Sequence, residues 1–120
     1  MPHFKAYSGI HWSYELSGQG ECLLFIHGFG GSLGWWKHQV EFFEKDFQIL
    51  RVDLPGHGQS SWKECSLISM AQDLKELLDH LGLYRINVIA SSFGGLIALE
   101  LLRLIPEEIS RLSLVGSLPK

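Results

Sequence analysis

The sequence predicts an α/β fold, with a mostly parallel sheet, helices on both faces and an antiparallel hairpin at the N-terminus. Short apolar runs that stop at glycine alternate with helical patterns of about ten or more residues, which is typical of βαβ units. The first residues instead read as two short strands around a tight turn. Because crossover connections are right-handed, successive helices pack on both faces of such a sheet.

The composition fits a single domain with its own core: 120 residues, 46% hydrophobic, with a formal net charge of −3. Mixed charge without a basic run argues against nucleic acid or an anionic membrane as partner. No stretch approaches the roughly 20 apolar residues of a membrane span, and the polar N-terminus does not resemble a signal peptide. We therefore expect a cytoplasmic protein. Cys22 and Cys65 lack metal-ligand spacing and are expected to be reduced thiols rather than a disulfide or a metal pair.

The first half of the chain predicts a hairpin, two buried strands and a helix. Ser8 and Gly9 form the hairpin turn, and two continuous apolar runs further on suit strands buried on both faces. Ser32 can cap the helix that lies between these runs, with Trp36 and Val40 on its buried stripe together with Phe43. The expected bounds are strands at 4–7, 11–16, 22–28 and 47–56 and a helix at 33–44.

The second half predicts two more helices and two more strands. Ser66 can cap the first helix, in which leucines recur at steps of three and four, and Gly82 follows as its C-terminal residue. Pro106 ends the second helix. The expected bounds are helices at 67–81 and 93–105 and strands at 86–91 and 111–116.

Three glycine-rich turns follow strands, at the edge of an open parallel sheet where reactive groups gather. They are HGFGGS (27–32), DLPGHGQS (53–60) and ASSFGG (90–95). The third joins a strand directly to a helix, so the residue at its apex projects into solvent, and residues two before and two after it must be small. Ser92 satisfies this requirement, because Ala90 and Gly94 are both small. Ser91 does not, because Phe93 would occupy one of the two positions.

A serine nucleophile needs a base to take its proton and donors to hold the resulting oxyanion. The backbone N–H of Phe93, in the first turn of a helix, is one candidate donor and is favoured by the helix dipole. The N–H of Phe29, directed by Gly28 and Gly30, is the other. The HGFGGS turn alone could be a plain glycine-rich connection. Together with Ser92 at the elbow it predicts an oxyanion hole.

These motifs, in this order, resemble the α/β-hydrolase superfamily, in particular small soluble serine hydrolases with an HGxGGS turn and a DxxGxGxS loop. The resemblance covers essentially the whole chain. It implies the α/β-hydrolase fold, Ser92 as nucleophile, and Phe29 and Phe93 as oxyanion donors. It also implies a structural loop beside the site, formed by Asp53, Gly56, His57, Gly58 and Ser60.

The elbow departs from the family pattern at two positions. Ala90 stands where glycine is usual, and Ser91 where a histidine or aromatic residue is common. Serine at position 92 argues against the haloalkane dehalogenase and epoxide hydrolase branches, which attack with a carboxylate.

The base and its orienting acid should follow the nucleophile, because the family order is Ser, then Asp or Glu, then His. After Ser92 the sequence has no histidine and no aspartate. The acidic residues after Ser92 are Glu100, Glu107 and Glu108, and none of them is placed to act as the orienting acid. Asp53 and His57 are better explained by their glycine-rich turn than as substitutes. His27, at the end of a buried strand, is expected to hold the loop by hydrogen bonds.

We therefore expect residues 1–120 to be the N-terminal half of one α/β-hydrolase domain, truncated after the sixth strand. Alone it would be inactive and would self-associate through the exposed edge of its last strand. The expected activity is hydrolysis of a carboxylic ester or thioester, a small-molecule acyl substrate, through an acyl-enzyme at Ser92, without metal or cofactor. Two alternatives remain open: a C–C hydrolase or lyase, as in menaquinone or biotin synthesis, and a non-catalytic binding or interaction protein.

Overall fold

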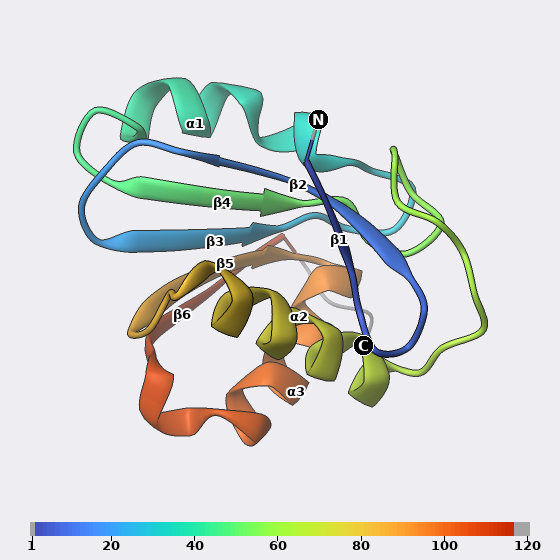
Figure 1. Ribbon diagram of the computed structural model, residues 1–120. Coiled ribbons are helices and arrows are strands. Elements are labelled where there is room, and N and C mark those ends of the chain that lie inside the picture. Colours follow the sequence, from blue (N-terminus) through green and yellow to red (C-terminus); the bar gives the residue numbers. More distant parts are fainter. Residues whose placement is uncertain (1, 117–120) are drawn as a thin grey trace.

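The computed structural model describes residues 2–116 and shows a six-stranded sheet with helices on both faces (Figure 1). The strands are β1 (His3–Lys5), β2 (His11–Ser17), β3 (Cys22–Ile26), β4 (Gln48–Val52), β5 (Ile86–Ser91) and β6 (Ile109–Val115). Their order in the sheet is β1-β2-β4-β3-β5-β6. The last four in this order are parallel, whereas β2 is antiparallel to both of its neighbours. The expected α/β class and N-terminal hairpin are confirmed.

Residues of the central strand β3 alternate between two layers of core. Leu23 and Phe25 pack with Val40 of α1 (Lys37–Phe43) on one face. Leu24 and Ile26 join the larger core beneath α2 (Leu67–Leu81) and α3 (Phe93–Leu104) on the other. All five β3 residues are buried, and full burial of a side chain of this size contributes about 1.5–3 kcal/mol. A strand buried on both faces therefore reads as the continuous apolar run CLLFI.

The helix expected at 33–44 is instead a 3₁₀ turn at Leu33–Trp36 followed by the shorter α1. The Ser32 hydroxyl caps the turn by accepting the Gly34 N–H at 3.3 Å. The Leu33 N–H donates to the Asp53 carboxylate at 2.7 Å. This long-range bond fixes the first turn, and glycine inside it disfavours a regular α-helix. The expected stripe is still correct, with Trp36 and Val40 buried.

Helix α2 has the expected bounds, and both of its ends are capped. The Ser66 hydroxyl accepts the Ser69 N–H at 3.1 Å, and the Ser69 hydroxyl in turn accepts the Ser66 N–H at 2.9 Å. This reciprocal pair is a capping box and satisfies N–H groups that the helix itself cannot pair. Gly82 follows with φ of +68°, the left-handed conformation in which helices commonly end.

A buried carboxylate joins the N-terminal hairpin to α2. Asp73 is 2% exposed, and its Oδ2 accepts the Trp12 indole N–H at 2.9 Å and the Ser8 hydroxyl at 2.7 Å. Hydrogen bonds to an ionised acceptor are stronger than neutral ones. The hairpin is therefore fastened to α2 by a contact between residues 61 positions apart in the sequence.

Several expected bounds were wrong by a few residues. Strands β3 and β4 end at Ile26 and Val52, rather than at 28 and 56, because the glycine-rich turns that follow them lie outside the sheet. The first strand ends at Lys5 rather than at 7, because the hairpin turn already begins at Ala6, whose N–H donates to the Ile10 carbonyl at 2.9 Å. Helix α3 ends at Leu104, one residue before the expected bound. The last strand begins at Ile109, two residues before its expected start, directly after a 3₁₀ turn at Pro106–Glu108.

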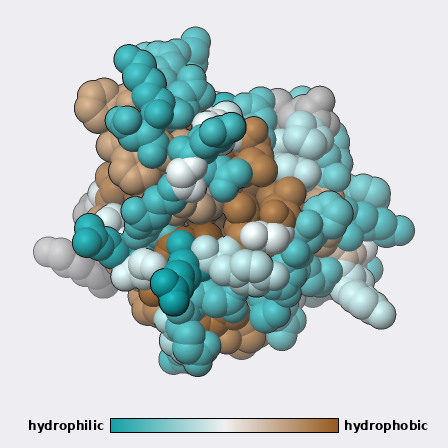
Figure 2. Space-filling view, turned by 60° about the vertical axis from the view of Figure 1, so that its left-hand side comes forward, coloured by the Kyte–Doolittle hydropathy of each residue, from teal (hydrophilic) through white to brown (hydrophobic). Residues whose placement is uncertain are grey.

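Strand β6 forms one edge of the sheet and carries exposed apolar side chains. Leu114 and Val115 are 43% and 48% exposed. A groove of about 480 Å³ runs between α1 and the neighbouring strands, lined by Phe43 and Ile89 among others. A view from the left-hand side of Figure 1 shows hydrophobic surface left exposed between hydrophilic patches (Figure 2). Within the described part of the chain, no helix is long and apolar enough to cross a membrane.

Candidate active site

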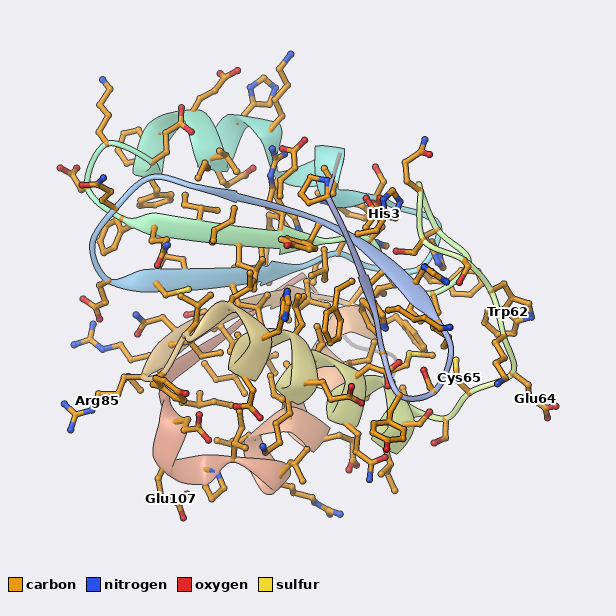
Figure 3. All side chains as sticks on the ribbon, in the orientation of Figure 1. His3, Trp62, Glu64, Cys65, Arg85 and Glu107 are labelled. Carbon is orange, nitrogen blue, oxygen red and sulfur yellow. The ribbon has the colours of Figure 1, made fainter. Side chains whose placement is uncertain are left out.

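The three glycine-rich turns meet at the carboxyl ends of β3, β4 and β5. Figure 3 shows Trp62 and Cys65 on the long segment at this end of the molecule, and Arg85 and Glu107 at the opposite end. The turn after β4 is covered by Trp62, whose ring lies 3.1 Å from where a Cβ on Gly56 would be. The candidate site is therefore built by loops on one edge of a rigid sheet, where open α/β sheets bind ligands.

Ser92 is the apex of the turn between β5 and α3. Its φ of +51° and ψ of −116° lie outside the conformations that residues other than glycine usually adopt. Such a conformation costs about 1–3 kcal/mol and clusters at functional sites. The Ser92 N–H donates to the Val115 carbonyl at 3.3 Å, and the Ser92 carbonyl accepts the Gly95 N–H at 2.9 Å. Ser91, by contrast, is a buried residue of β5.

Close packing around this apex explains the small residues on either side. A Cβ on Gly94 would lie 2.5 Å from the His27 carbonyl oxygen and 2.8 Å from that of Ile26. Both of those atoms belong to the backbone, so they cannot move aside cheaply. Ala90 is fully buried in β5. The first turn of α3 thus lies directly against the end of β3, and it carries the Phe93 N–H at the positive end of the helix dipole.

The HGFGGS turn lies beside Ser92. A Cβ on Gly28 would sit 3.3 Å from the Ser92 Cβ, so the two turns are in contact. The Phe29 side chain is 76% exposed and packs edge-on against the Phe93 ring, with centroids 5.9 Å apart. Among residues 2–116, the Phe29 N–H has no hydrogen-bond acceptor. An oxyanion hole needs backbone donors that are not already paired, and the Phe29 N–H meets this one requirement.

Two further contacts shape this turn. The Gly31 N–H donates to the Gly28 carbonyl at 3.0 Å and closes the turn. The Trp35 ring occupies the space that a side chain on Gly31 would need. Trp35 is half-exposed. The sequence did not indicate its role in this turn, because its packing on Gly31 does not follow from residue spacing.

His27 is fully buried and both of its ring nitrogens are occupied. Its Nδ1–H donates to the Gly28 carbonyl at 2.6 Å, and its Nε2 accepts the Leu54 N–H at 3.0 Å. Burial lowers the pKa of His27 below its ordinary value of 6.5, which keeps the ring neutral. The ring holds the turn after β3 against the chain after β4. It has no free nitrogen with which to take a proton from Ser92.

His57 is occupied in the same way. Its Nε2 accepts the Gly30 N–H at 2.9 Å, and its Nδ1–H donates to the Pro55 carbonyl at 3.1 Å. Its ring centroid lies 5.2 Å from that of His27 and 5.3 Å from that of Phe29. Sequence reasoning placed His57 in a structural loop, but it did not identify the bond to Gly30.

The Asp53 carboxylate is 2% exposed and is hydrogen-bonded to backbone groups. One oxygen accepts the Leu33 N–H at 2.7 Å and the other accepts the Gln59 N–H at 3.0 Å. A side chain on Gly58 would overlap this carboxylate, so glycine is required there. The Ser60 hydroxyl donates to the Asp53 carbonyl at 2.6 Å. Both oxygens of the buried Asp53 carboxylate thus accept backbone N–H groups of the surrounding loops.

The acidic residues that follow Ser92 in the sequence are not placed to act as its catalytic partners. Glu100 lies two turns along α3, and Glu107 and Glu108 belong to the 3₁₀ turn at the far end of the molecule (Figure 3). Within the described residues, no three His, Cys, Asp or Glu side chains form a group that could hold a metal ion. The geometry therefore brings a serine with a strained backbone into contact with the HGFGGS turn, and the nearby imidazoles and carboxylate are hydrogen-bonded to backbone groups.

Comparison with known proteins gives a consistent family match. A family model described as the alpha/beta hydrolase fold matches residues 21–120. Among curated relatives, the pimeloyl-[acyl-carrier protein] methyl ester esterase of Nitrosomonas europaea is 37% identical over 105 residues, which are 88% of this chain and 40% of that protein. The dihydrolipoyllysine-residue acetyltransferase component of the acetoin cleaving system of Pseudomonas putida is 32% identical over 111 residues, 90% of this chain and 30% of that protein.

A solved structure adds the same fold. A thermophilic esterase from Thermogutta terrifontis superposes with a TM-score of 0.87 at 30% sequence identity, covering 94% of this chain and 44% of the esterase. The chain thus spans less than half the length of each of these relatives.

Proposed function

The chain belongs to the α/β-hydrolase fold family, and on this premise we propose that it carries the nucleophile and oxyanion hole of a serine hydrolase. The substrate is a carboxylic ester or thioester of a small molecule. Ser92 is the nucleophile, and the backbone N–H groups of Phe29 and Phe93 hold the oxyanion. The observation that carries the proposal is the strained backbone of Ser92 at a strand-to-helix turn, in contact with the Gly28 turn. The name of the Nitrosomonas relative, an ester hydrolase, agrees with this substrate class.

The reaction proceeds in two steps. The Ser92 oxygen attacks the carbonyl carbon, and its proton passes to a base, while the carbonyl oxygen becomes an oxyanion held by the two N–H groups. The carbon–oxygen or carbon–sulfur bond then breaks, and the leaving alcohol or thiol takes up that proton. Water attacks the acyl-enzyme in the same manner and releases the acid. In this proposal the base is a histidine outside residues 2–116, because His27 and His57 are already committed to backbone groups.

The test compares Ser92→Ala with Ser91→Ala in the product of the complete reading frame that contains this chain. We expect Ser92→Ala to lower kcat/KM for p-nitrophenyl esters by at least about 10³-fold, since removing a nucleophile leaves only binding and oxyanion stabilisation. Ser91→Ala should stay within a few fold. A fluorophosphonate probe should label Ser92, as located by mass spectrometry of the peptide that contains it.

The 120-residue polypeptide alone should show no such turnover. A folded, complete protein that neither hydrolyses esters nor labels at Ser92 would contradict the proposal and favour a non-catalytic binding protein.

A further inference from the structure

We infer that His57 is a positioning residue for the oxyanion hole: its neutral ring holds the Gly30 N–H, and thereby fixes the turn that presents the Phe29 N–H to the reacting carbonyl. This inference rests on the proposed function for its catalytic meaning. The contact on which it depends, Gly30 N–H to His57 Nε2 at 2.9 Å, is independent of that function.

The turn is held from both sides by a reciprocal pair of histidines. His27, in the turn after β3, accepts the N–H of Leu54 in the loop after β4. His57, in the loop after β4, accepts the N–H of Gly30 in the turn after β3. Each loop therefore supplies one ring acceptor to the backbone of the other. Neither bond belongs to a helix or a strand ladder. Together with the Leu33 N–H bond to Asp53, these two ring contacts hold the two loops against each other.

The two rings act on adjacent peptide groups. His27 donates to the Gly28 carbonyl, which belongs to the same peptide group as the Phe29 N–H. Because C=O and N–H point in opposite directions across a trans peptide, this bond directs the Phe29 N–H away from His27. His57 holds the next peptide through the Gly30 N–H. Gly30 has a φ of +84°, and a Cβ there would meet nothing within 4 Å, so packing of its own does not fix it.

The bond to Gly30 exists only while Nε2 of His57 carries no proton. Protonation would place a second N–H opposite the Gly30 N–H, and two donors cannot pair. The rings packed against that of His57 are those of His27, with centroids 5.2 Å apart, and Phe29, with centroids 5.3 Å apart.

Two substitutions separate the acceptor from the packing of the ring. His57→Phe keeps an aromatic ring against Phe29 and His27 but removes both nitrogens. His57→Gln places an amide oxygen near the position of Nε2 and does not titrate. In the complete protein we expect His57→Phe to lower kcat about 10- to 100-fold, with KM changed less than about threefold, because loss of one oxyanion donor costs up to 10²–10³. His57→Gln should retain kcat within about fivefold.

Exposed His38 on α1 provides a matched control, and His38→Gln should leave kcat unchanged. Equal losses in His57→Phe and His57→Gln would overturn the inference, because the acceptor would then not matter. So would an unchanged kcat in a folded His57→Phe protein.

Nuclear magnetic resonance tests the contact without any turnover. The His57 ring should be the Nδ1–H tautomer, and a scalar coupling across the hydrogen bond should connect the Gly30 amide to Nε2 of the ring. That coupling should survive in His38→Gln. An Nε2–H tautomer, or a Gly30 amide without this coupling, would overturn the inference even if Ser92 proves to be the nucleophile. If instead Ser92 is inactive while these signals behave as expected, the proposed function fails and the contact stands.

Discussion

At the scale of single residues, backbone geometry rather than side-chain chemistry distinguishes the candidate site. Ser92 holds a positive φ, and the space at Gly94 leaves no room for a methyl group. The neighbouring polar side chains, such as those of His27 and Asp53, form hydrogen bonds with backbone peptide groups. These residues build a scaffold of backbone hydrogen bonds around Ser92, and in the proposed function the chemistry falls to Ser92 and a separate base.

The buried imidazole of His27 makes stability depend on pH. Its pKa is lowered in the folded state by burial, while in the unfolded chain it returns to about 6.5. Above that pH neither state binds the proton. As the pH falls below 6.5, His27 binds a proton in the unfolded chain but stays neutral in the folded one. The free energy of unfolding therefore decreases as the pH falls.

We expect the free energy of unfolding, from urea denaturation, to fall by up to about 1.4 kcal/mol per pH unit below pH 6.5 through this residue. His27→Asn should flatten that slope, whereas His38→Gln should keep it. A slope that is the same in wild type and His27→Asn would show that His27 is not responsible.

At the scale of elements, α2 is the most completely specified part of the chain. Its apolar spacing, its serine cap and its terminal glycine all agree, and the structure reproduces the expected bounds. The helix before it was only partly predictable. The Leu33 N–H bonds to Asp53, twenty residues further on, and a contact of that kind is invisible in local sequence patterns.

The same limit applies to the candidate site. Turn composition indicated where Ser92, Gly28 and Gly94 would lie, because sterics act between near neighbours in the chain. The pairing of Gly30 with His57 joins residues 27 positions apart. It depends on how β3 and β4 sit side by side, which only the folded sheet determines.

The cap of α2 gives a prediction at this scale. Ser66→Ala removes the acceptor for the Ser69 N–H and breaks the reciprocal pair. Loss of such a cap costs about 0.5–2 kcal/mol. Urea denaturation should show a fall of this size in the free energy of unfolding, whereas Ser110→Ala, at an exposed position of β6, should change it by less than about 0.5 kcal/mol. Equal effects of the two substitutions would mean that the cap contributes nothing.

At the scale of the whole molecule, the sheet is protected unevenly. Its antiparallel border, β1, is only three residues long, and short edge strands resist pairing with other chains. Its other border, β6, is seven residues long and has exposed apolar side chains near its end. An edge of this kind offers unpaired N–H and C=O groups to another copy.

We expect the 120-residue polypeptide on its own to self-associate through β6. Sedimentation velocity should show species larger than the 13.6 kDa monomer. Leu114→Lys, which places a charge on the exposed edge, should shift the distribution towards monomer. Ile68→Lys, at an exposed position on α2, provides the control and should not. A monomeric wild type across micromolar concentrations would contradict this expectation.

The position of β3 in the middle of the sheet also affects how the chain can fold while it is being synthesised. Its two neighbours, β4 and β5, both come later in the chain, and about 60 residues separate the end of β3 from the start of β5. A ribosome adding roughly 5–20 residues per second needs about 3–12 s to make that stretch. Until β5 is made, the CLLFI segment can pair with β4 on one side only, and its other edge is open to aggregation in a newly synthesised chain.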